Sequence, residues 1–517
     1  MIYLDHAATT PLADSVLPAM LPWMGQDAGF ANPASSHAPG RAARAAVERA
    51  RQQVASLIGA QPAEIIWTSG ATESNNLAIK GALEFSALKD AHVLSSRTEH
   101  RCVLDTCRWL ETRGTRVSYL KPNADGRITV EQVMAALRPE TALVSLMWVN
   151  NETGAMNYIA AIAPVLRERG IALHVDAAQA VGKIEVGLSQ IPIDLLSISA
   201  HKLGGPKGVG ALFVRKKPRA RLAPQMHGGG HEWGMRSGTL ATHQIVGLGA
   251  ACDRLHGRVA SLAQALSALR ERMYKALGEL PDVHRNGAQT HVAPHILNLS
   301  FEGVDGESLR AGLCDLAVSS GSACSSATAE PSYVLRALGR SDALADASLR
   351  FSFGENTSEA DIDQAAQRVF EEVRFLRAIA QGKASVSPGA LSNVLDYPAP
   401  VWRRFRNPDR IGAIESSMVG RICATVDDFS GHGQLSIELV SVQGQVQSAV
   451  FSALGCPTTI AVGQWICEQI AWQPTSVLSQ IKAQAIAKAL EIGESRLQCA
   501  LMGEDVVKRL NEQLRES

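Results

Sequence analysis

Between residues 64 and 214 the sequence alternates short apolar runs with stretches of helical spacing. The runs "EIIWTSG", "HVLSS", "RVSYL", "ALVSLMWV", "ALHVDA", "LLSIS" and "GVGALFV" have the length and composition of buried strands. Segments between them, such as "IAAIAPVLRERG", repeat apolar residues at helical intervals. This alternation predicts an α/β fold with a mostly parallel sheet covered by helices. Ligands of such sheets bind beyond the carboxyl ends of the strands.

The pattern changes after this region. From about 260 to 380, a long helical stretch precedes "HILNLSFEG", "SLRFSFG" and a closing helix, which predicts a smaller α+β domain. Residues 381–400 lack clear periodicity and are interpreted as a linker. Residues 401–517 have strand patterns followed by helices and are numerous enough for an independent α+β domain. We therefore expect a first unit at 1–380, with a large domain at about 15–255 and a small domain at about 260–380 plus the N-terminus.

Composition narrows the range of functions. The chain has 517 residues, of which 50 are basic and 50 acidic, so its charge gives no reason to expect nucleic acid or a membrane surface as the main partner. The first residues, "MIYLDHAATTPL", have neither the basic nor the apolar region of a signal peptide, and the longest apolar runs are too short to span a bilayer. The nine cysteines are scattered without a CxxC motif. We expect a cytoplasmic protein with reduced thiols.

Several polar groups follow predicted strands, where they would meet at one edge of the sheet. Lys202 comes between a strand and a glycine-rich turn, a setting that can desolvate an amine and make it nucleophilic. Asp176 ends one strand and His100 follows another. The turn "TSGATES" offers free backbone N–H groups at a helix start, which suit a phosphate. A Schiff-base lysine, a carboxylate for a ring nitrogen and a phosphate cradle are what a pyridoxal phosphate site requires.

One cysteine lies in an unusual setting, in the stretch "SSGSACSSATAEP" from Ser319 to Pro331. Cysteine is usually buried as a small hydrophobic residue. The glycine, serine, alanine and threonine around Cys324 cannot bury much, so the segment is interpreted as an exposed loop. The pattern therefore presents a thiol on a mobile tether.

Residues 1–380 resemble the cysteine desulfurases of the NifS/IscS type, which are fold-type I pyridoxal phosphate enzymes. The resemblance covers essentially the whole of that unit. It implies a large domain based on a parallel sheet, a small α+β domain, a homodimer and L-cysteine as the substrate. It is carried by "YLDHAATTP", "NPASSHAPGRAA", "TSGATESNNLAIKG", "VNNETG", "HVDAAQ", "SAHKLGGPKGVGAL", "GMRSGTL" and "SSGSACSSA".

The resemblance assigns site residues position by position. Lys202 would hold the cofactor covalently, Asp176 would pair with its ring nitrogen, and His100 would stack on the ring and act as acid and base. Gln179 would bond the phenolic oxygen, and Thr239 would reach the phosphate of the neighbouring subunit. The other cofactor contacts would come from Ala71, Thr72, Asn151, Ser199 and His201. Of these, Asn151 would contact either the cofactor or the substrate. The substrate carboxylate would be held by Asn32 and Arg350.

In this family a loop thiolate takes the sulfur of a cysteine bound to the cofactor, and the resemblance gives this role to Cys324, which would keep a persulfide. A mobile, exposed tether suits a group that collects sulfur inside the site and delivers it outside. The other cysteines of this unit are interpreted as packing residues: Cys102, Cys107, Cys252 and Cys314.

The sequence departs from the family pattern at two places. Trp233 stands where arginine is usual, and Glu355 and Asn356 stand where an arginine and an aromatic residue are usual. Both places lie near segments that shape the site entrance or the dimer contact in the family. The departures therefore concern partner choice and loop docking rather than the cofactor chemistry.

Residues 401–510 resemble, more weakly, the U-type (IscU/NifU-like) iron–sulfur scaffold proteins. The resemblance is carried by "RRFRNPDRIGAIE", "GCPTTIAVGQWICEQI" and "ESRLQCALMGEDVVKRL". Cys456 and Cys499 fall at two cysteine positions of the scaffold, so the resemblance implies an iron–sulfur cluster, iron or zinc at these residues. The Cys324 persulfide is an additional candidate ligand.

The scaffold pattern is incomplete. Gln498 replaces the histidine that usually precedes the last cysteine, and the first scaffold cysteine has a match only if Cys423, with Asp427 or Asp428, replaces it. Two interpretations stay open for this domain. It either handles sulfur or metal, or it is a docking domain that has lost its metal site.

These observations together imply a cysteine desulfurase fused to its own sulfur acceptor. It would convert L-cysteine to L-alanine, leave a persulfide on Cys324 and deliver sulfur for iron–sulfur assembly, to the C-terminal domain or to other acceptor proteins. The alternative is a selenocysteine lyase or another class V enzyme on the same fold, with the C-terminal domain as a docking module. The Cys324 segment separates the two, because an aminotransferase has no use for a tethered thiol.

Overall fold

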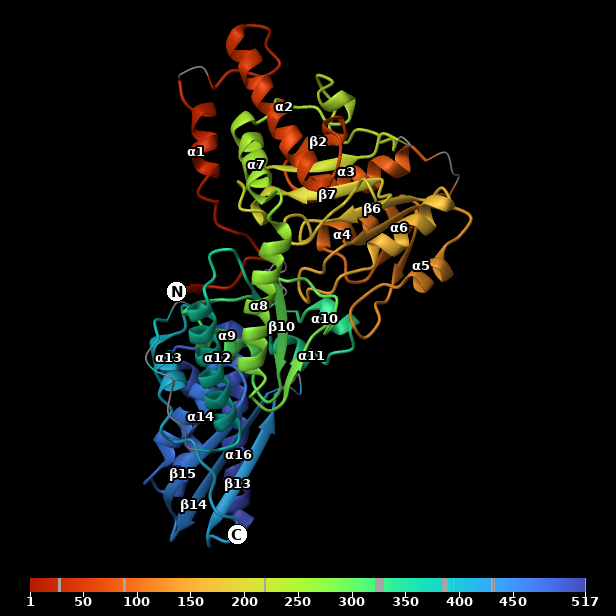
Figure 1. Cartoon of the computed structure of the whole chain (residues 1–517). Coiled ribbons are helices and arrows are strands. Elements are labelled where there is room, and N and C mark those ends of the chain that lie inside the picture. The colour runs from red at the N-terminus through yellow and green to blue at the C-terminus, as the bar shows by residue number, and fades with distance from the viewer. Residues whose placement is uncertain are drawn as a thin grey trace.

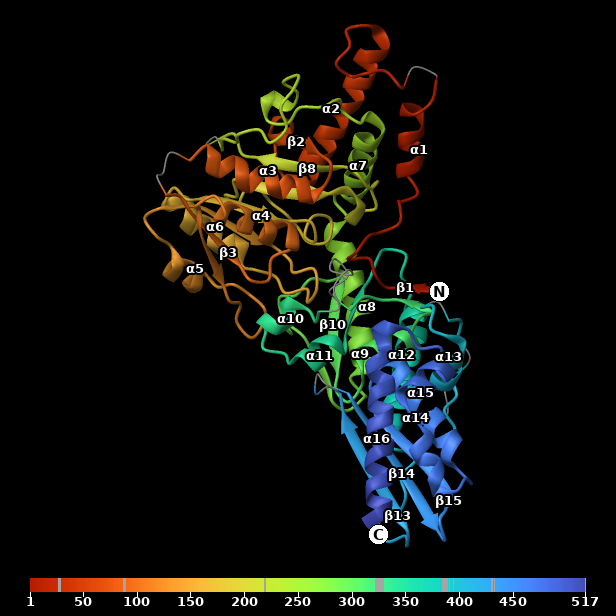
Figure 2. The same ribbon diagram turned by 180° about the vertical axis from the view of Figure 1, so that it is seen from behind.

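Three parts follow one another along the length of the molecule in this computed structural model (Figure 1). The large domain lies at one end, the small domain in the middle and the C-terminal unit at the other end, and the view from behind shows the same order (Figure 2). The structure describes residues 1–26, 29–86, 90–217, 220–320, 330–383, 389, 391–393, 395–428, 431 and 433–516.

The large domain is built on a seven-stranded sheet with the order β2-β8-β7-β6-β5-β3-β4. Strands β3 to β7 run parallel to their neighbours in this group, and β8 is antiparallel to both β7 and β2. The predicted α/β class with a mostly parallel sheet is therefore confirmed. The strands are β2 (Ile65–Thr68), β3 (His92–Ser96), β4 (Arg116–Leu120), β5 (Thr141–Met147), β6 (Ala172–Asp176), β7 (Leu195–Ser199) and β8 (Gly210–Val214).

Helices cover both faces of this sheet because its strands are apolar on both sides. Val93 and Leu143 pack against side chains of α3 and α4 on one face of the sheet. Leu94 and Val144, the next residues along the same strands, belong to the apolar core on the opposite face. The helices of this domain are α1 (Val16–Met20), α2 (Ala38–Ile58), α3 (Ala71–Glu84), α4 (Arg101–Glu111), α5 (Val130–Ala136), α6 (Ile159–Glu168) and α7 (Thr242–Leu255).

The small domain has an antiparallel sheet of the order β12-β10-β9, covered by helices. The N-terminal strand β1 (Ile2–Tyr3) pairs with β11 (Leu316–Ala317) of this domain, which brings the first residues of the chain beside it. The other elements are α8 (Val259–Leu277), β9 (Val283–Arg285), β10 (Ile296–Phe301), α9 (Gly306–Gly312), α10 (Tyr333–Ala337), α11 (Asp342–Asp346), β12 (Ser348–Ser352) and α12 (Glu359–Ala380).

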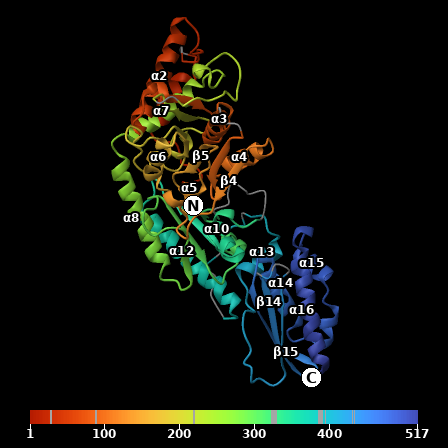
Figure 3. The same ribbon diagram turned by 90° about the vertical axis from the view of Figure 1, so that its right-hand side faces the viewer.

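The C-terminal unit is a three-stranded antiparallel sheet with helices along one face (Figure 3). Strands β14 and β15 are joined by Gln443 and Gly444, both with positive φ (51° and 74°), as a tight two-residue hairpin requires. The elements are α13 (Ala399–Arg406), β13 (Arg421–Asp427), β14 (Gln434–Val442), β15 (Gln445–Leu454), α14 (Pro457–Ile470), α15 (Ala483–Leu490) and α16 (Leu497–Glu516).

The C-terminal unit packs directly on the small domain. Their apolar side chains form one continuous core that includes Phe375 of α12 and Phe405 of α13. The buried guanidinium of Arg406 lies 2.7 Å from the buried carboxylate of Glu372, and the Ser308 hydroxyl donates to the Gly455 carbonyl at 2.7 Å. This contact, and not only the chain at 381–400, sets the position of the unit.

Candidate active site

A cavity of about 520 Å³ opens where strands of the large sheet end and the N-terminal segment crosses them. Most of the residues expected to bind cofactor or substrate line it, although they come from distant parts of the chain. These residues are Ala71, Thr72, His100, Asn151, Asp176, Gln179, Ser199, His201, Lys202 and Arg350. Asn32 and Thr239 are exposed on the surface outside this lining, and Cys324 lies outside the described residues.

Lys202 ends a short 3₁₀ turn, Ala200–Lys202, which directly follows β7. Its ammonium donates hydrogen bonds to the main-chain carbonyls of Ala7 and of Ala8, the latter at 2.9 Å. The N-terminal segment therefore holds the amine at the cavity wall. An amine placed in this way can react with an aldehyde carbonyl in the cavity.

Asp176 ends β6 and presents a fixed, buried carboxylate to the cavity. One carboxylate oxygen accepts from the side-chain amide of Asn75 at 2.7 Å, and the other accepts from the backbone N–H of Ala178 at 3.0 Å. The two hydrogen bonds fix the orientation of the carboxylate. A carboxylate held in this way suits a protonated ring nitrogen.

The first turn of α3 offers an anion cradle in the same cavity. Helix α3 has 14 residues and follows Gly70 at a φ of 151°, and no side chain caps its first N–H groups. Ala71 and Thr72 of this turn line the cavity. Thr72, Ser199 and His201 add hydroxyl and imidazole groups to the same lining. Burial, and then the charges of Lys202 and Lys207, lower the pKa of His201 to about 4. The donor set fits a phosphate group.

His100 is fixed by the start of α4, where it is the N-cap residue. Its Nδ1 accepts from the backbone N–H of Cys102 at 3.2 Å and lies 3.0 Å from the Cys102 sulfur. The ring is thus oriented at the cavity wall, as a group that stacks on a cofactor requires. Cys102, interpreted from sequence as a packing residue, lines the cavity as well.

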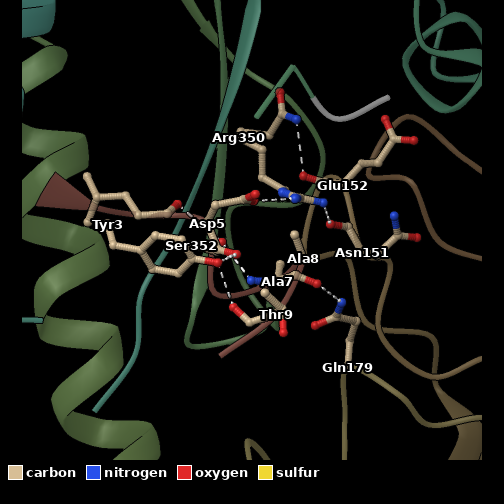
Figure 4. A network of polar contacts seen from close by, with 12 residues as sticks. Tyr3, Asp5, Ala7, Ala8, Thr9, Asn151, Glu152, Gln179, Arg350 and Ser352 are labelled. Carbon is tan, nitrogen blue, oxygen red and sulfur yellow. Dashed lines mark hydrogen bonds and ion pairs between the residues drawn. The ribbon is translucent and has the colours of Figure 1, made fainter. Parts of the chain in front are cut away.

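Arg350 of β12 is the cation of the small-domain wall (Figure 4). Its guanidinium bonds the Asp5 carboxylate at 2.6 Å and the Asn151 carbonyl at 2.9 Å. The Nε of Arg350 and the side-chain oxygen of Asn151 are buried without a hydrogen-bond partner in the described structure. Buried polar atoms are usually satisfied, so these two atoms mark a place for a polar ligand.

Three buried residues of this region were missed from the sequence. Burial raises the pKa of Glu152 to about 7, although the Ser332 hydroxyl bonds its carboxylate and Arg350 lies near. Burial also raises the pKa of Glu99 well above its usual value. His295 bonds the side-chain oxygen of Gln179 at 3.2 Å, which fixes that amide. The burial and contacts of these three residues come from parts of the chain that are distant in sequence, so no local sequence pattern identified them.

The two departures from the family pattern lie outside this cavity lining. Trp233 is exposed, has a positive φ of 55°, and its ring contacts the guanidinium of Arg51 at 4.9 Å. Glu355 pairs with Arg254 and Arg258 and lines a separate cavity of about 320 Å³ together with Asn356. Neither departure changes the groups that face the active-site cavity.

A second site lies where the C-terminal unit meets the small domain. Cys456, the N-cap of α14, and Cys499, in the first turn of α16, have sulfurs 3.7 Å apart. The hydrogen bond from Cys499 lowers the pKa of Cys456 to about 6, and the same contact raises the pKa of Cys499. The cavity of about 480 Å³ around them is also lined by Asp305 and Glu307 of the small domain.

The groups around this pair are two thiols and several carboxylates. Within the parts of the chain that the structure describes, no three His, Cys, Asp or Glu side chains form a metal-binding group. Gln498 lines the cavity in place of a histidine, together with Asp427 and Asp428. Cys423 lies on β13 near Ser436, with their side chains 3.7 Å apart, and is not part of the lining.

Comparison with known proteins identifies the family. Residues 2–365 match Aminotransferase class-V. The fold and the donors of the cavity agree with this class of pyridoxal phosphate enzymes. Cysteine desulfurase IscS of Stutzerimonas stutzeri is 56% identical over 415 residues, which are 80% of this chain and 98% of that protein. The corresponding protein of Azotobacter vinelandii is 55% identical over 379 residues, 73% and 94% of the two chains. The chain belongs to the cysteine desulfurase family.

Solved structures and a second family match extend this result. A NifS-like protein is 31% identical with a TM-score of 0.67, covering 72% of this chain and all (100%) of that one. A structure titled SspA in complex with cysteine is 39% identical with a TM-score of 0.62, covering 68% and 99%. Residues 396–513 match the NifU-like N terminal domain, so the chain joins a desulfurase to a NifU-like domain.

Proposed function

We propose that the protein takes sulfur from L-cysteine onto Cys324, releases L-alanine and passes the sulfur to its NifU-like domain. The observation that carries this proposal is the convergence of Lys202, Asp176, the first turn of α3 and Arg350 on one cavity. A selenocysteine lyase or an aminotransferase is not favoured, since the curated relatives are named cysteine desulfurases.

Pyridoxal phosphate, when bound, supplies an electron sink for bond cleavage next to the amino group of the substrate. Lys202 would hold it, Asp176 would keep its ring nitrogen protonated, and Gln179 would bond its phenolic oxygen. The α3 turn, Thr72, Ser199 and His201 would hold its phosphate. The unpartnered Nε of Arg350 would face the substrate carboxylate, and His100 would move a proton beside the ring.

The ends of the segment that carries Cys324 support its role at this cavity. Before the segment, Ser319 forms a backbone bridge with Arg350, with N–O distances of 2.6 and 3.3 Å. After it, the Ser332 hydroxyl bonds Glu152, and the Tyr333 hydroxyl donates to the Glu99 carbonyl at 2.7 Å. Ser319, Ser332 and Tyr333 thus contact Arg350, which lines the cavity, or residues next to His100 and Asn151, which line it as well.

Replacing Cys324 with serine tests the carrier. We expect Cys324→Ser to bind L-cysteine with an unchanged spectral response but to form alanine at least about a hundredfold more slowly, because the sulfur acceptor is lost. Alanine is measured by chromatography. Cys314→Ser, a change of a half-buried thiol outside the cavity, is the matched control. Alanine formation at the unaltered rate in Cys324→Ser would favour a lyase that discharges sulfur directly.

A homodimer is the assembly that we propose. Thr239 and Asn32 are expected at the site but are exposed outside the cavity lining, as residues that serve a neighbouring subunit would be. Exposed apolar side chains around α1, namely Leu17, Leu21, Met24 and Phe30, offer a surface for such a contact. Sedimentation should give twice the chain mass, and a monomer with full activity would contradict the proposal.

For the NifU-like domain we favour sulfur acceptance over a resident metal. The cluster, iron or zinc implied by the family stays a prediction, since no three His, Cys, Asp or Glu side chains of the described residues are grouped as metal ligands. Other iron–sulfur assembly proteins remain expected acceptors, and the cytoplasmic location stays a prediction. No helix in the described part of the chain is long and apolar enough to cross a membrane.

A further inference from the structure

The NifU-like domain brings two thiols into contact. Sγ of Cys456 lies 3.7 Å from Sγ of Cys499, and the Thr459 hydroxyl lies 3.6 Å from each sulfur. A disulfide bond is about 2.05 Å long, so the sulfurs would have to approach by roughly 1.7 Å. The pair has the geometry of a dithiol that can be oxidised.

The two thiols differ in access. Both residues line the cavity, but Cys456 is partly exposed, whereas Cys499, in the first turn of α16, is only 4% exposed. A sulfur donor that enters the cavity therefore meets Cys456 first. Cys499 is less exposed than Cys456 and lies close enough to react with it.

The cavity wall is formed partly by the desulfurase unit. Arg496, three residues before Cys499, forms an ion pair with Glu307 of α9 at 2.7 Å. Gly455, next to Cys456, accepts the hydroxyl hydrogen bond of Ser308 on the same helix. A residue close in sequence to each cysteine thus contacts α9 of the desulfurase unit.

We propose that Cys456 and Cys499 act as a dithiol that reduces the delivered sulfur and releases it as sulfide. The inference rests on the proposed function, because the persulfide that the pair consumes is the product of the desulfurase reaction. It assigns to the NifU-like domain a reducing role that does not need a third ligand.

The reaction balances in two displacement steps. Cys456 attacks the outer sulfur of the donor persulfide, so a new S–S bond forms, the donor S–S bond breaks and the donor cysteine leaves as a thiolate. Cys499 then attacks Sγ of Cys456. The bond between the two cysteines forms, the bond to the outer sulfur breaks, and this sulfur leaves as sulfide with the proton of the Cys499 thiol.

The electrons also balance. The outer sulfur gains two electrons, and the two thiols lose two electrons as they become a disulfide. A dithiol reductant then restores Cys456 and Cys499 by thiol–disulfide exchange. Each sulfide released would therefore consume one equivalent of the dithiol reductant that restores the pair.

The test is a single turnover of the full-length holoenzyme with one equivalent of L-cysteine and no added thiol. Alanine reports the desulfurase reaction, free sulfide reports release, and mass spectrometry without reduction reports the state of the cysteines. The unaltered protein should release about one sulfide per alanine and form a matching amount of Cys456–Cys499 disulfide.

Three variants sharpen the test. Cys499→Ser should form alanine normally, release at least about tenfold less sulfide and accumulate persulfide on Cys456. Cys456→Ser should form alanine once and leave the persulfide on the desulfurase unit. Cys423→Ser, a thiol of the same domain outside the cavity, should behave like the unaltered protein.

Two results would overturn the inference while the proposed function stands. One is alanine with a persulfide on Cys456 that never becomes a disulfide in the unaltered protein. The other is full sulfide release from Cys499→Ser. Absence of alanine in the unaltered holoenzyme would instead contradict the proposed function, and the inference with it.

Discussion

Lys202→Ala is expected to abolish turnover of L-cysteine, with a loss of at least about a thousandfold. The amine of Lys202 is held by the carbonyls of Ala7 and Ala8, in the cavity that the first turn of α3 and Asp176 also line. Its removal would leave the phosphate and ring contacts but no group to hold the cofactor covalently. Alanine formation and the absorbance of the covalently held cofactor measure the effect.

Borohydride reduction of the unaltered protein, followed by peptide mapping, identifies the lysine directly. The cofactor should be fixed on Lys202 and on no other residue. Lys217→Ala, a change of an exposed lysine on the segment after β8, is the control and should retain activity. Cofactor found on another lysine, or turnover retained in Lys202→Ala, would refute the assignment.

Much of the large domain could be predicted from sequence because its strands are short, apolar and separated by turns. The runs "HVLSS", "RVSYL" and "LLSIS" coincide with β3, β4 and β7 residue for residue. The direction of β8 could not be predicted. Its apolar pattern is the same in either direction, and only pairing with β7 and β2 shows that it is antiparallel.

The candidate site was predictable where a residue follows a strand. Asp176 is the last residue of β6, and Lys202 ends the short turn after β7, so the topology of one sheet brings them to the same edge. Arg350 belongs to the small domain and is positioned by Asp5 from the N-terminus, a contact that only the folded chain provides. The buried Glu152 and His295 depend in the same way on neighbours distant in sequence.

The contact between the C-terminal unit and the small domain also could not be predicted. The stretch 381–400 suggested a linker between independent units, since a lack of periodicity says nothing about packing on either side. The interface depends on single pairs such as Glu372 with Arg406, which are 34 residues apart in sequence. The closeness of Cys456 and Cys499 likewise arises from the packing of α14 against α16.

Arg406→Leu is expected to weaken the attachment of the C-terminal unit by about 3 kcal/mol, because it leaves the Glu372 carboxylate buried with incomplete compensation. Both side chains are at most 2% exposed. Arg368, with a nitrogen 3.2 Å from the other oxygen of Glu372, would remain and keep the loss at the lower end of the range for buried pairs. Calorimetry and protease cleavage within 381–400 measure the effect.

The pH dependence and two further variants distinguish this mechanism from a packing defect. Burial already raises the pKa of Glu372 despite its arginine partners, and loss of Arg406 would raise it further. When the pKa of a carboxyl is raised in the folded state, the free energy of unfolding of the protein falls as pH rises. The difference in this free energy between Arg406→Leu and the unaltered protein should therefore grow with pH.

The double variant Glu372→Leu with Arg406→Leu should be more stable than Arg406→Leu, because no buried charge is left. Arg272→Leu, a change in an exposed arginine with two carboxylate partners, should have little effect. Equal destabilisation by the single and double variants at every pH would show that packing of the Arg406 side chain, and not its charge, holds the two units together.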